Sequence, residues 1–257
     1  MIGYTWSMDG FPPHLVMSMP LHAITEMYGE TGLRQRFALE IRRFDRPDRD
    51  RIEQAFGLAA ELHRLDRRSR EPYLNHILRT TIRIITYYEV TDVDVIVAAL
   101  LHDAVEDHPE ELAGQRPGDR VEAALAELAE RFTPRAAELV RAVTNPPREP
   151  GRDRYEQYRE HVAESLEANP WARVIKVSDF TDNGVGLMHS LPTKYRPLAT
   201  KYRPLVPVLR ELIARKDTPL SDAVKAHIDG QLDAAEERFN AILGEVDAGS
   251  ATGPREG

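Results

Sequence analysis

One short stretch of this sequence constrains the fold more than any other: an apolar run that ends in a cluster of ionisable side chains. The run Val95-Ile-Val-Ala-Ala-Leu-Leu101 is followed directly by His102-Asp103-Ala-Val-Glu106-Asp107. The apolar residues cannot all face solvent, so we expect a helix that is buried on most of its circumference. If the helix continues, His102 stacks on Glu106 and Asp103 on Asp107, one turn apart. Because burying charge is costly unless a metal or a partner compensates it, the stretch predicts a functional site at the end of a core helix.

The rest of the chain also predicts helices. Apolar residues recur at helical spacing, and we find no alternation typical of strands. The fold class is therefore expected to be all-α. The expected helices span residues 21–43, 50–65, 73–88, 93–105, 120–132, 134–144, 153–168, 171–187 and 218–247. Residues 1–20 are expected to be irregular because prolines interrupt them, and Gly184 and Gly186 are expected to weaken the helix over 171–187 by about 1 kcal/mol each.

Composition excludes several classes of function. The chain has 257 residues and no cysteine, so it can build neither a disulfide scaffold nor a thiolate nucleophile, and any metal must be bound by His, Asp and Glu. The 34 Lys and Arg against 42 Asp and Glu leave a formal charge of −8. That balance argues against binding to duplex nucleic acid, which depends on clustered positive charge. It does not exclude a small anionic ligand held by a few local arginines.

The sequence does not predict a membrane protein. No apolar run approaches the roughly 20 residues that a membrane helix needs. The N-terminal segment has no basic region followed by an apolar one, so we expect no signal peptide. A cytoplasmic location is the expectation.

Two further residues have the character of metal ligands. His76 opens the helix before the apolar run, and Asp179 ends the apolar stretch over residues 174–178, 76 residues after Asp103. Together with His102 and Asp103 they form a set of two imidazoles and two carboxylates. Such a set suits Mn²⁺, Fe²⁺ or Zn²⁺ with positions left open for water.

At this point the chain resembles a known family. The order His76, His102-Asp103, Asp179 matches the H…HD…D pattern of HD-domain metal phosphohydrolases. Three segments resemble the hydrolase domain of RelA/SpoT-type alarmone enzymes. Residues 67–76 (RRSREPYLNH) are similar to R-K-S-G-E-P-Y-x-x-H, residues 98–107 (AALLHDAVED) to A-A-x-L-H-D-V-V-E-D, and residues 174–183 (VIKVSDFTDN) to L-I-K-L-A-D-R-L-H-N. The likeness covers about residues 50–215 and looks like a stand-alone small alarmone hydrolase.

The resemblance implies a domain organisation and a cofactor. It implies an HD-domain helical bundle over residues 46–215, preceded by a partly helical extension over 1–45. Residues 216–247 would form a helix packed on the bundle, and 248–257 a disordered tail. His76, His102, Asp103 and Asp179 would hold the metal, which in this family is usually Mn²⁺, although another divalent ion would also fit.

The resemblance also implies an activity, the hydrolysis of the 3′-pyrophosphate of guanosine 3′,5′-bis(diphosphate) and of the pentaphosphate. The products would be GDP or GTP and pyrophosphate. Glu106 and Asp107 would position or deprotonate the attacking water and protonate the leaving oxygen. Arg67 would contact the guanine base, Arg68 the anionic substrate, and Asn183 the ribose.

The sequence departs from the family pattern at several positions. Arg70 stands where the family has glycine, so either the backbone differs there or the arginine adds a phosphate contact. Ile77 replaces a proline after the first histidine. Phe180-Thr-Asp182 replaces R-L-H, and Gly184-Val-Gly-Leu187 replaces M-R-T-L. Since these segments lie near the substrate in the family, they bear on substrate identity.

Two alternatives to the guanosine substrate therefore stay open. The first is an HD phosphohydrolase for an adenosine polyphosphate or a pyrophosphorylated RNA 3′ end, acting as an antitoxin to an alarmone synthetase. The second is a non-catalytic HD module that binds a nucleotide and signals through a partner. In every case the expected partner is a guanosine or adenosine polyphosphate and not duplex nucleic acid or a membrane. The sequence leaves open whether the protein is a monomer or a homo-oligomer.

One local repeat has no assigned role. Thr193-Lys-Tyr-Arg-Pro-Leu198 recurs as Thr200-Lys-Tyr-Arg-Pro-Leu205, a spacing of seven residues that places both copies on nearly the same helical face. It is either a locally duplicated helix edge kinked by proline or a cationic rim, formed by Lys194, Arg196, Lys201 and Arg203, beside a phosphate site.

Overall fold

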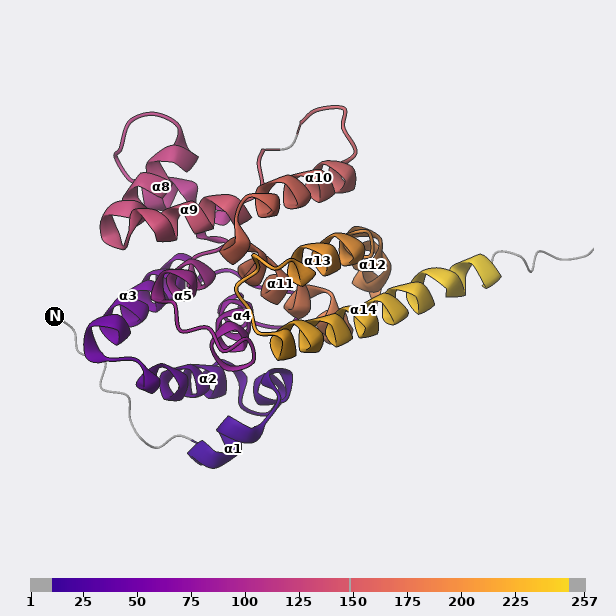
Figure 1. The fold of residues 1–257 in the computed structure, drawn as a ribbon, viewed down its shortest axis with the longest axis horizontal. Coiled ribbons are helices and arrows are strands. Elements are labelled where there is room, and N and C mark those ends of the chain that lie inside the picture. Colours follow the sequence, from indigo (N-terminus) through magenta and orange to yellow (C-terminus); the bar gives the residue numbers. More distant parts are fainter. Residues whose placement is uncertain (1–10, 148, 250–257) are drawn as a thin grey trace, which may run out of the picture.

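The computed structural model describes residues 11–147 and 149–249, and over this range it is built from helices joined by short loops (Figure 1). Within it there is no strand, only an isolated bridge between Arg67 and Pro72, so the all-α prediction is confirmed. The α-helices are α1 (Pro13–Ser18), α2 (Leu21–Glu40), α3 (Arg46–Leu62), α4 (Leu74–Thr86), α5 (Val93–Leu100), α6 (Ala104–Asp107), α7 (Pro109–Ala113), α8 (Arg120–Arg131), α9 (Pro134–Val143), α10 (Arg154–Glu167), α11 (Pro170–Asn183), α12 (Tyr195–Tyr202), α13 (Leu205–Ala214) and α14 (Asp222–Gly249). Three short 3₁₀ helices are η1 (Ile41–Arg43), η2 (Val185–His189) and η3 (Pro192–Lys194).

Helix α4 lies at the centre of the bundle (Figure 1). It packs against α2, α5 and α11, and each of its residues from Leu74 to Ile85 is buried. Helix α5 is almost as enclosed, since all of its residues except Asp94 are buried. The prediction of a core helix formed by the apolar run is therefore correct. The two most buried helices are the ones that lead into the ionisable cluster.

The expected continuous helix over residues 93–105 is wrong at its C-terminal end. Helix α5 ends at Leu100, a turn follows, and the separate helix α6 begins at Ala104. Leu101 has φ −111° and ψ 11°, outside the helical region. His102 and Asp103 therefore lie in a turn, where their side chains can point to one place instead of lying 100° apart around a helix.

Helix beginnings follow the expected signals. Thr133 accepts a hydrogen bond from the backbone N–H of Ala136, and Pro134 is the first residue of α9. Asn169 accepts one from Ala172 at the start of α11. Helix α11 ends at Asn183 rather than at residue 187, so Gly184 and Gly186 lie beyond the helix that they were expected to weaken.

The N-terminal region is more regular than expected. Residues 13–18 form α1, which Pro13 can begin because proline fits the first turn of a helix. Helix α2 contains a break at Gly29, whose φ of 60° favours glycine. Its second half carries a buried Arg36–Glu40 ion pair of 2.7 Å and packs against α4. The boundary drawn at residue 45 stays a prediction.

The C-terminal part comprises α12, α13 and the long α14, which pack against one another. Ser221 accepts a hydrogen bond from Val224, in agreement with a helix start at this serine. Of the predicted disordered tail over 248–257, residues 250–257 lie outside the described residues. In the described part of the chain, every helix is too short or too polar to cross a bilayer.

Candidate metal centre

The structure brings the four predicted ligands together from three places. His76 lies near the start of α4, His102 and Asp103 lie in the turn after α5, and Asp179 lies on α11. Nε2 of His102 is 3.0 Å from Oδ2 of Asp103 and 3.9 Å from Oδ1 of Asp179. Nε2 of His76 is 3.6 Å and 3.3 Å from the same two oxygens. Four ligand atoms therefore converge on one point.

The hydrogen bonds of the two imidazoles show what this point can hold. Nδ1 of His102 lies 2.8 Å from the carbonyl oxygen of Ala99, which can only accept, so Nδ1 carries the proton. Nδ1 of His76 is likewise 2.8 Å from Oδ2 of Asp182. In the neutral rings both Nε2 atoms therefore present lone pairs toward carboxylate oxygens, and Nε2 of His102 is buried without a hydrogen-bond partner. The nitrogen lone pairs and the carboxylate oxygens repel one another unless a cation lies between them. The donor set therefore fits a divalent metal.

The electrostatics of the protein groups also favour a cation at this point. Burial acts to lower the pKa of His76, but its bonds to Asp103, Asp179 and Asp182 prevail and raise it to about 9. The pKa of His102 is also raised, against burial, by the charge of Asp103. The carboxylates therefore favour positive charge at the point where these groups converge.

Each carboxylate ligand is held by further contacts. Oδ2 of Asp103 accepts a hydrogen bond of 2.7 Å from the hydroxyl of Tyr73. Oδ2 of Asp179 lies 3.1 Å from Nζ of the buried Lys176, and its Oδ1 accepts from the amide of Asn183. Lys176 therefore orients and neutralises this carboxylate.

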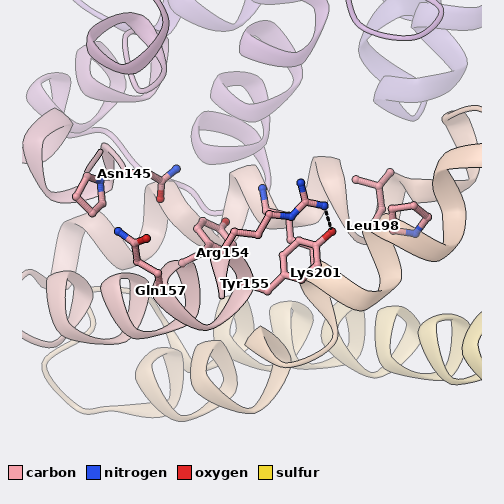
Figure 2. A pocket seen from close by; sticks show the side chains of 9 residues that line it. Asn145, Arg154, Tyr155, Gln157, Leu198 and Lys201 are labelled. Atoms are coloured by element: carbon pink, nitrogen blue, oxygen red, sulfur yellow. Dashed lines mark hydrogen bonds between the residues drawn. The ribbon is translucent and has the colours of Figure 1, made fainter. Parts of the chain in front are cut away.

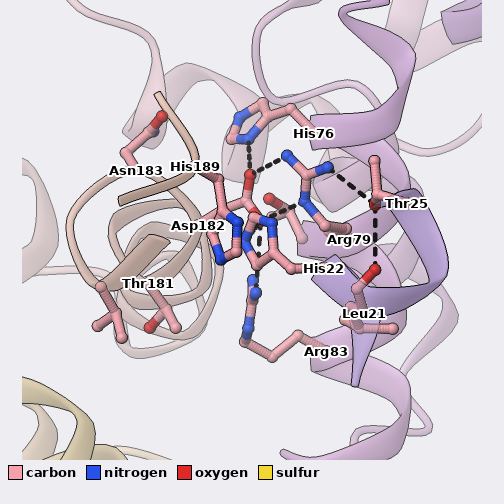
Figure 3. A network of polar contacts seen from close by, with 12 residues as sticks. Leu21, His22, Thr25, His76, Arg79, Arg83, Thr181, Asp182, Asn183 and His189 are labelled. Carbon is pink, nitrogen blue, oxygen red and sulfur yellow. Dashed lines mark hydrogen bonds and ion pairs between the residues drawn. The ribbon is translucent and has the colours of Figure 1, made fainter. Parts of the chain in front are cut away.

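Asp182 is a residue that sequence reasoning missed. It is 4% exposed and lies at the middle of the network in Figure 3. Besides His76, it accepts two hydrogen bonds from Arg79, at 2.8 and 2.9 Å, and one of 3.4 Å from Arg83. Nε2 of His22 lies 3.6 Å away. The available signal was its spacing, because Asp182 follows Asp179 by about one helical turn.

A second cluster, formed by His63, Asp66 and His108, packs against the tyrosine that contacts Asp103. Oδ2 of Asp66 lies 2.8 Å from Nδ1 of His63 and 2.7 Å from Nε2 of His108. The ring of His63 stacks on Tyr73 at 4.8 Å, which fixes the phenol that donates to Asp103. The sequence positions of these two histidines give no sign that Asp66 joins them. This trio also has the geometry of a possible metal group.

Glu106 and Asp107 follow the ligands on α6 and are exposed. Oε2 of Glu106 accepts hydrogen bonds of 3.1 and 2.8 Å from the backbone and side-chain nitrogens of Asn145. Partial desolvation, with the negative charges of Asp103 and Glu106, raises the pKa of Asp107 to about 6. A carboxyl group with such a pKa can exchange a proton near neutral pH.

The two arginines that were predicted to contact the substrate, Arg67 and Arg68, differ in their positions. The guanidinium of Arg68 lies 5.8 Å from the ring centre of Tyr73, donates to Oδ1 of Asn183 and approaches Asp182 at 3.9 Å. The side chain of Arg67 is exposed, and its backbone pairs with Pro72. Arg70, at the family's glycine position, has no positive φ, so the loop accepts arginine without strain. Of the three, Arg68 is the one that reaches the centre.

Two pockets flank the centre. One, which we call the aromatic pocket, has a volume of about 360 Å³ and is shown in Figure 2. The other, the cationic pocket, has a volume of about 210 Å³. The aromatic pocket is lined by Asn145, Pro146, Arg154, Tyr155, Gln157, Tyr158, Pro197, Leu198 and Lys201. The cationic pocket is lined by His22, Arg68, Ser69, Arg70, Glu71, Arg79, Asp182, Gly186, His189, Ser190, Lys194 and Leu198.

Comparisons with known proteins identify the family of this chain. A family model described as HD domain matches residues 55–168. A Drosophila melanogaster protein named guanosine-3′,5′-bis(diphosphate) 3′-pyrophosphohydrolase MESH1 is 30% identical over 138 residues, which cover 52% of this chain and 68% of that protein. The Mus musculus protein of the same name is 31% identical over 144 residues, 54% of this chain and 71% of that protein. This chain belongs to the HD-domain family of the MESH1 proteins.

Two further proteins are also similar to this chain. A protein of Aquifex aeolicus (strain VF5), named guanosine-3′,5′-bis(diphosphate) 3′-pyrophosphohydrolase, is 31% identical over 140 residues, but these cover only 17% of its length. A solved structure described as a metazoan orthologue of SpoT that hydrolyses ppGpp covers 76% of this chain and 94% of that one, at 23% identity and a TM-score of 0.48. The predicted resemblance and the HD-domain fold are confirmed by the family assignment.

The departures of this HD domain from the family pattern fall mostly in its interior. Phe180 is buried edge-to-face against Tyr202 and Phe239, and the hydroxyl of Thr181 donates to the carbonyl of Val177. Asp182 orients His76. These substitutions were expected to bear directly on the substrate, but they change the support of the metal ligands more than the surface that a substrate meets.

Proposed function

We propose that this enzyme hydrolyses the 3′-pyrophosphate of guanosine 3′,5′-bis(diphosphate) and of the corresponding pentaphosphate. The products would be GDP or GTP and pyrophosphate. The observation that carries the proposal is the convergence of two imidazole nitrogens and two carboxylate oxygens, with inward-facing lone pairs, in a chain 30–31% identical to proteins that bear this activity in their names. The membership in an HD phosphohydrolase family makes hydrolysis of a phosphate ester the reaction class.

The proposed cofactor is Mn²⁺, held by His76, His102, Asp103 and Asp179. When bound, a divalent ion supplies Lewis acidity toward phosphate oxygens and lowers the pKa of water beside them. The second nitrogen of each histidine is fixed by Ala99 or Asp182, so the ligands are oriented before the ion binds.

The proton transfers are proposed for Glu106 and Asp107. A water molecule attacks the phosphorus joined to the ribose 3′-oxygen, the bond between that phosphorus and oxygen breaks, and the oxygen leaves with a proton. Asp107, whose pKa is raised to about 6, can supply or accept this proton near neutral pH. Glu106, held by Asn145, is placed to orient the water.

The remaining contacts are proposed from the arrangement around the centre. Arg68 and Asn183 form one hydrogen-bonded unit that touches Asp179, so they are suited to contact the ribose and its phosphate groups. Arg67 is assigned only to the outer approach, since its side chain is exposed. Tyr155 and Tyr158 in the aromatic pocket offer ring surfaces on which a purine can stack.

Pyrophosphate release tests the function. Purified protein with Mn²⁺ and guanosine 3′,5′-bis(diphosphate) is expected to release one pyrophosphate per GDP, measured by phosphate chromatography. Asp103→Ala removes a ligand and is expected to abolish turnover, whereas Glu53→Ala, an exposed carboxylate on α3, serves as the matched control. Absence of product at micromolar enzyme, or full activity in Asp103→Ala, would exclude the proposal.

A panel of substrates tests the alternatives. Stacking on tyrosines does not distinguish guanine from adenine, so the aromatic pocket also suits an adenosine polyphosphate. Faster hydrolysis of the adenosine analogue, or of an RNA with a 3′-diphosphate, would reassign the substrate and leave the chemistry unchanged. Metal binding without turnover of any nucleotide would indicate a non-catalytic module.

A further inference from the structure

We propose that His63, Asp66 and His108 form a second metal site, separate from the proposed centre, which binds Zn²⁺. We call it the outer metal site. Its side chains follow the ends of α3 and α6, and Nδ1 of His63 and Nε2 of His108 lie 2.8 and 2.7 Å from Oδ2 of Asp66. Two imidazole nitrogens and one carboxylate oxygen suit Zn²⁺, which can take three protein ligands and a water molecule at tetrahedral positions.

The backbone places these three ligands before an ion binds. The N–H of Asp66 donates to the carbonyl of His63 at 3.1 Å, and the carbonyl of Asp66 accepts from the N–H of Tyr73 at 3.0 Å. The carbonyl of His108 accepts from the N–H of Leu112 at 3.1 Å, at the junction of α6 and α7. Ligand atoms around a tetrahedral zinc ion lie about 3.3 Å apart. The nitrogen–oxygen distances must therefore open by only about half an ångström, which rotation of the side chains supplies.

The charges at this point favour a cation. Oε1 of Glu111 lies 3.6 Å from Nδ1 of His108, and in the described part of the chain neither Asp66 nor Glu111 has a lysine or arginine within 4.0 Å. Burial lowers the pKa of His63, so its ring is neutral at neutral pH, as a metal ligand must be. Burial acts to raise the pKa of Asp66, but the hydrogen bonds from His108 and His63 prevail and lower it, so this carboxylate is ionised.

Glu111 distinguishes a metal site from a network of hydrogen bonds alone. If both neutral imidazoles donate to Asp66, Nδ1 of His108 is left as an acceptor that faces the carboxylate of Glu111. If an ion occupies Nε2 instead, the proton of the neutral ring lies on Nδ1 and faces that carboxylate. A histidine that binds a metal through one nitrogen and turns the other toward a carboxylate is a recurring arrangement.

The outer metal site would support the proposed centre through one tyrosine. The ring of His63 stacks on Tyr73 with the ring centres 4.8 Å apart, and the phenol donates to Oδ2 of Asp103 at 2.7 Å. An ion on Nδ1 prevents rotation of the His63 ring and so keeps Tyr73 beside Asp103. The side chain of His63 is fully buried, whereas that of Asp66 is 33% exposed. An ion can therefore enter from the Asp66 side and keep a water molecule there.

Zinc binding to the full chain tests the outer metal site without any nucleotide. Zn²⁺ is titrated by calorimetry, and the bound metal is counted by atomic spectroscopy after dialysis. Wild-type protein is expected to hold one ion at the proposed centre and one at the outer metal site. Asp66→Asn is expected to remove only the outer ion, and Asp103→Ala only the central one. Glu111→Gln is expected to weaken the outer ion about 10- to 100-fold, whereas Glu110→Gln, at the neighbouring exposed carboxylate of α7, should leave both ions unchanged.

Two variants keep the test decisive. Circular dichroism shows whether Asp66→Asn is folded, and Glu111 is 61% exposed, so its replacement leaves the packing intact. Equal Zn²⁺ content in wild type and folded Asp66→Asn would overturn the inference, as would equal outer affinity in wild type and Glu111→Gln. The inference does not depend on the proposed function, because counting ions needs no hydrolysis. An outer ion in a protein that releases no pyrophosphate would contradict only that function.

Discussion

At the scale of single residues, the proposed metal centre depends on the Nδ1 atoms of His76 and His102, which face away from the metal position. The carbonyl oxygen of Ala99 accepts a hydrogen bond from Nδ1 of His102, and Asp182 accepts one from Nδ1 of His76. Both Nε2 atoms are therefore left as acceptors. Asp182 is in turn held by two hydrogen bonds from Arg79. The affinity of the site for metal is therefore expected to depend on a residue that does not touch it.

Asp182→Asn tests this dependence. The amide keeps the shape of the side chain but removes the charge that fixes His76, and we expect Mn²⁺ to bind about 10- to 100-fold more weakly. The measurement is Mn²⁺ titration followed by calorimetry on the folded protein. Glu40→Gln is the matched control, since Glu40 is also a buried carboxylate held by arginines but lies away from the centre. Equal Mn²⁺ affinity in wild type and Asp182→Asn would contradict the role given to Asp182.

His22 makes stability depend on pH. Burial lowers the pKa of His22 to about 3, against an unfolded value near 6.5. Because the unfolded chain binds this proton and the folded chain does not, the stabilising contribution is complete above pH 6.5 and is lost as the pH falls toward 3. Between pH 7 and pH 5 we expect the free energy of unfolding of His22→Gln to fall by about 2 kcal/mol less than that of wild type in urea unfolding. His227→Gln, at an exposed histidine, should follow wild type, and parallel curves for all three proteins would refute the prediction.

At the residue scale, the sequence predicted those candidate site residues that are neighbours in one sequence motif. His102, Asp103, Glu106 and Asp107 were found because a charged cluster follows a buried run. Asp182 and Tyr73 were missed because their importance comes from their partners, His76 and Asp103, which lie 106 and 30 residues away. No local pattern reports which distant side chain a buried carboxylate or phenol will meet.

At the scale of elements, glycines have opposite effects in different settings. A Cβ on Gly186 in η2 would lie 2.8 Å from Nε2 of His22, whose ring is held by stacking on His189. Gly57 lies exposed within α3, and a Cβ there would meet nothing within 4 Å. The close approach of η2 to α2 therefore requires a residue without a side chain, whereas the middle of α3 does not.

These two positions give a paired prediction. Gly186→Ala is expected to lower the free energy of unfolding by about 1–3 kcal/mol, because His22 must shift from a packed position. Gly57→Ala is expected to raise it by about 0.5–1 kcal/mol, because alanine restricts the unfolded chain and favours the helix. Both are measured by urea unfolding followed by circular dichroism. A Gly186→Ala protein as stable as wild type would show that the contact is not constrained.

The elements themselves were predictable where capping and periodicity agree. Thr133-Pro134 and the apolar run of α5 place two helices correctly. The break after Leu100 was not predictable, because the residues on both sides of it favour helix. It exists because the side chains of His102 and Asp103 are held by Ala99 and Tyr73, and these contacts form only in the folded protein.

At the scale of the whole molecule, the helical spacing of apolar residues predicted the all-α class. It did not predict which helices pack against one another. Helix α2 lies in the segment that was expected to be an N-terminal extension, yet it packs on α4. Its Thr25 accepts a hydrogen bond of 3.2 Å from Arg79 of that helix. The residues of α2 alone predict a helix without showing its partner. Similarly, the two copies of the repeat were expected on one face, and their lysines line different pockets.

The long sequence separations within the centre have a consequence for how the protein is made. His76 and Asp182 are 106 residues apart, and Arg68 and Asn183 are 115 apart. During synthesis the N-terminal ligands leave the ribosome well before α11, and contacts between distant segments form slowly. The nascent chain therefore holds His76, His102 and Asp103 without the residues that orient and complete them. We therefore expect metal to bind at this site only after α11 has joined the bundle.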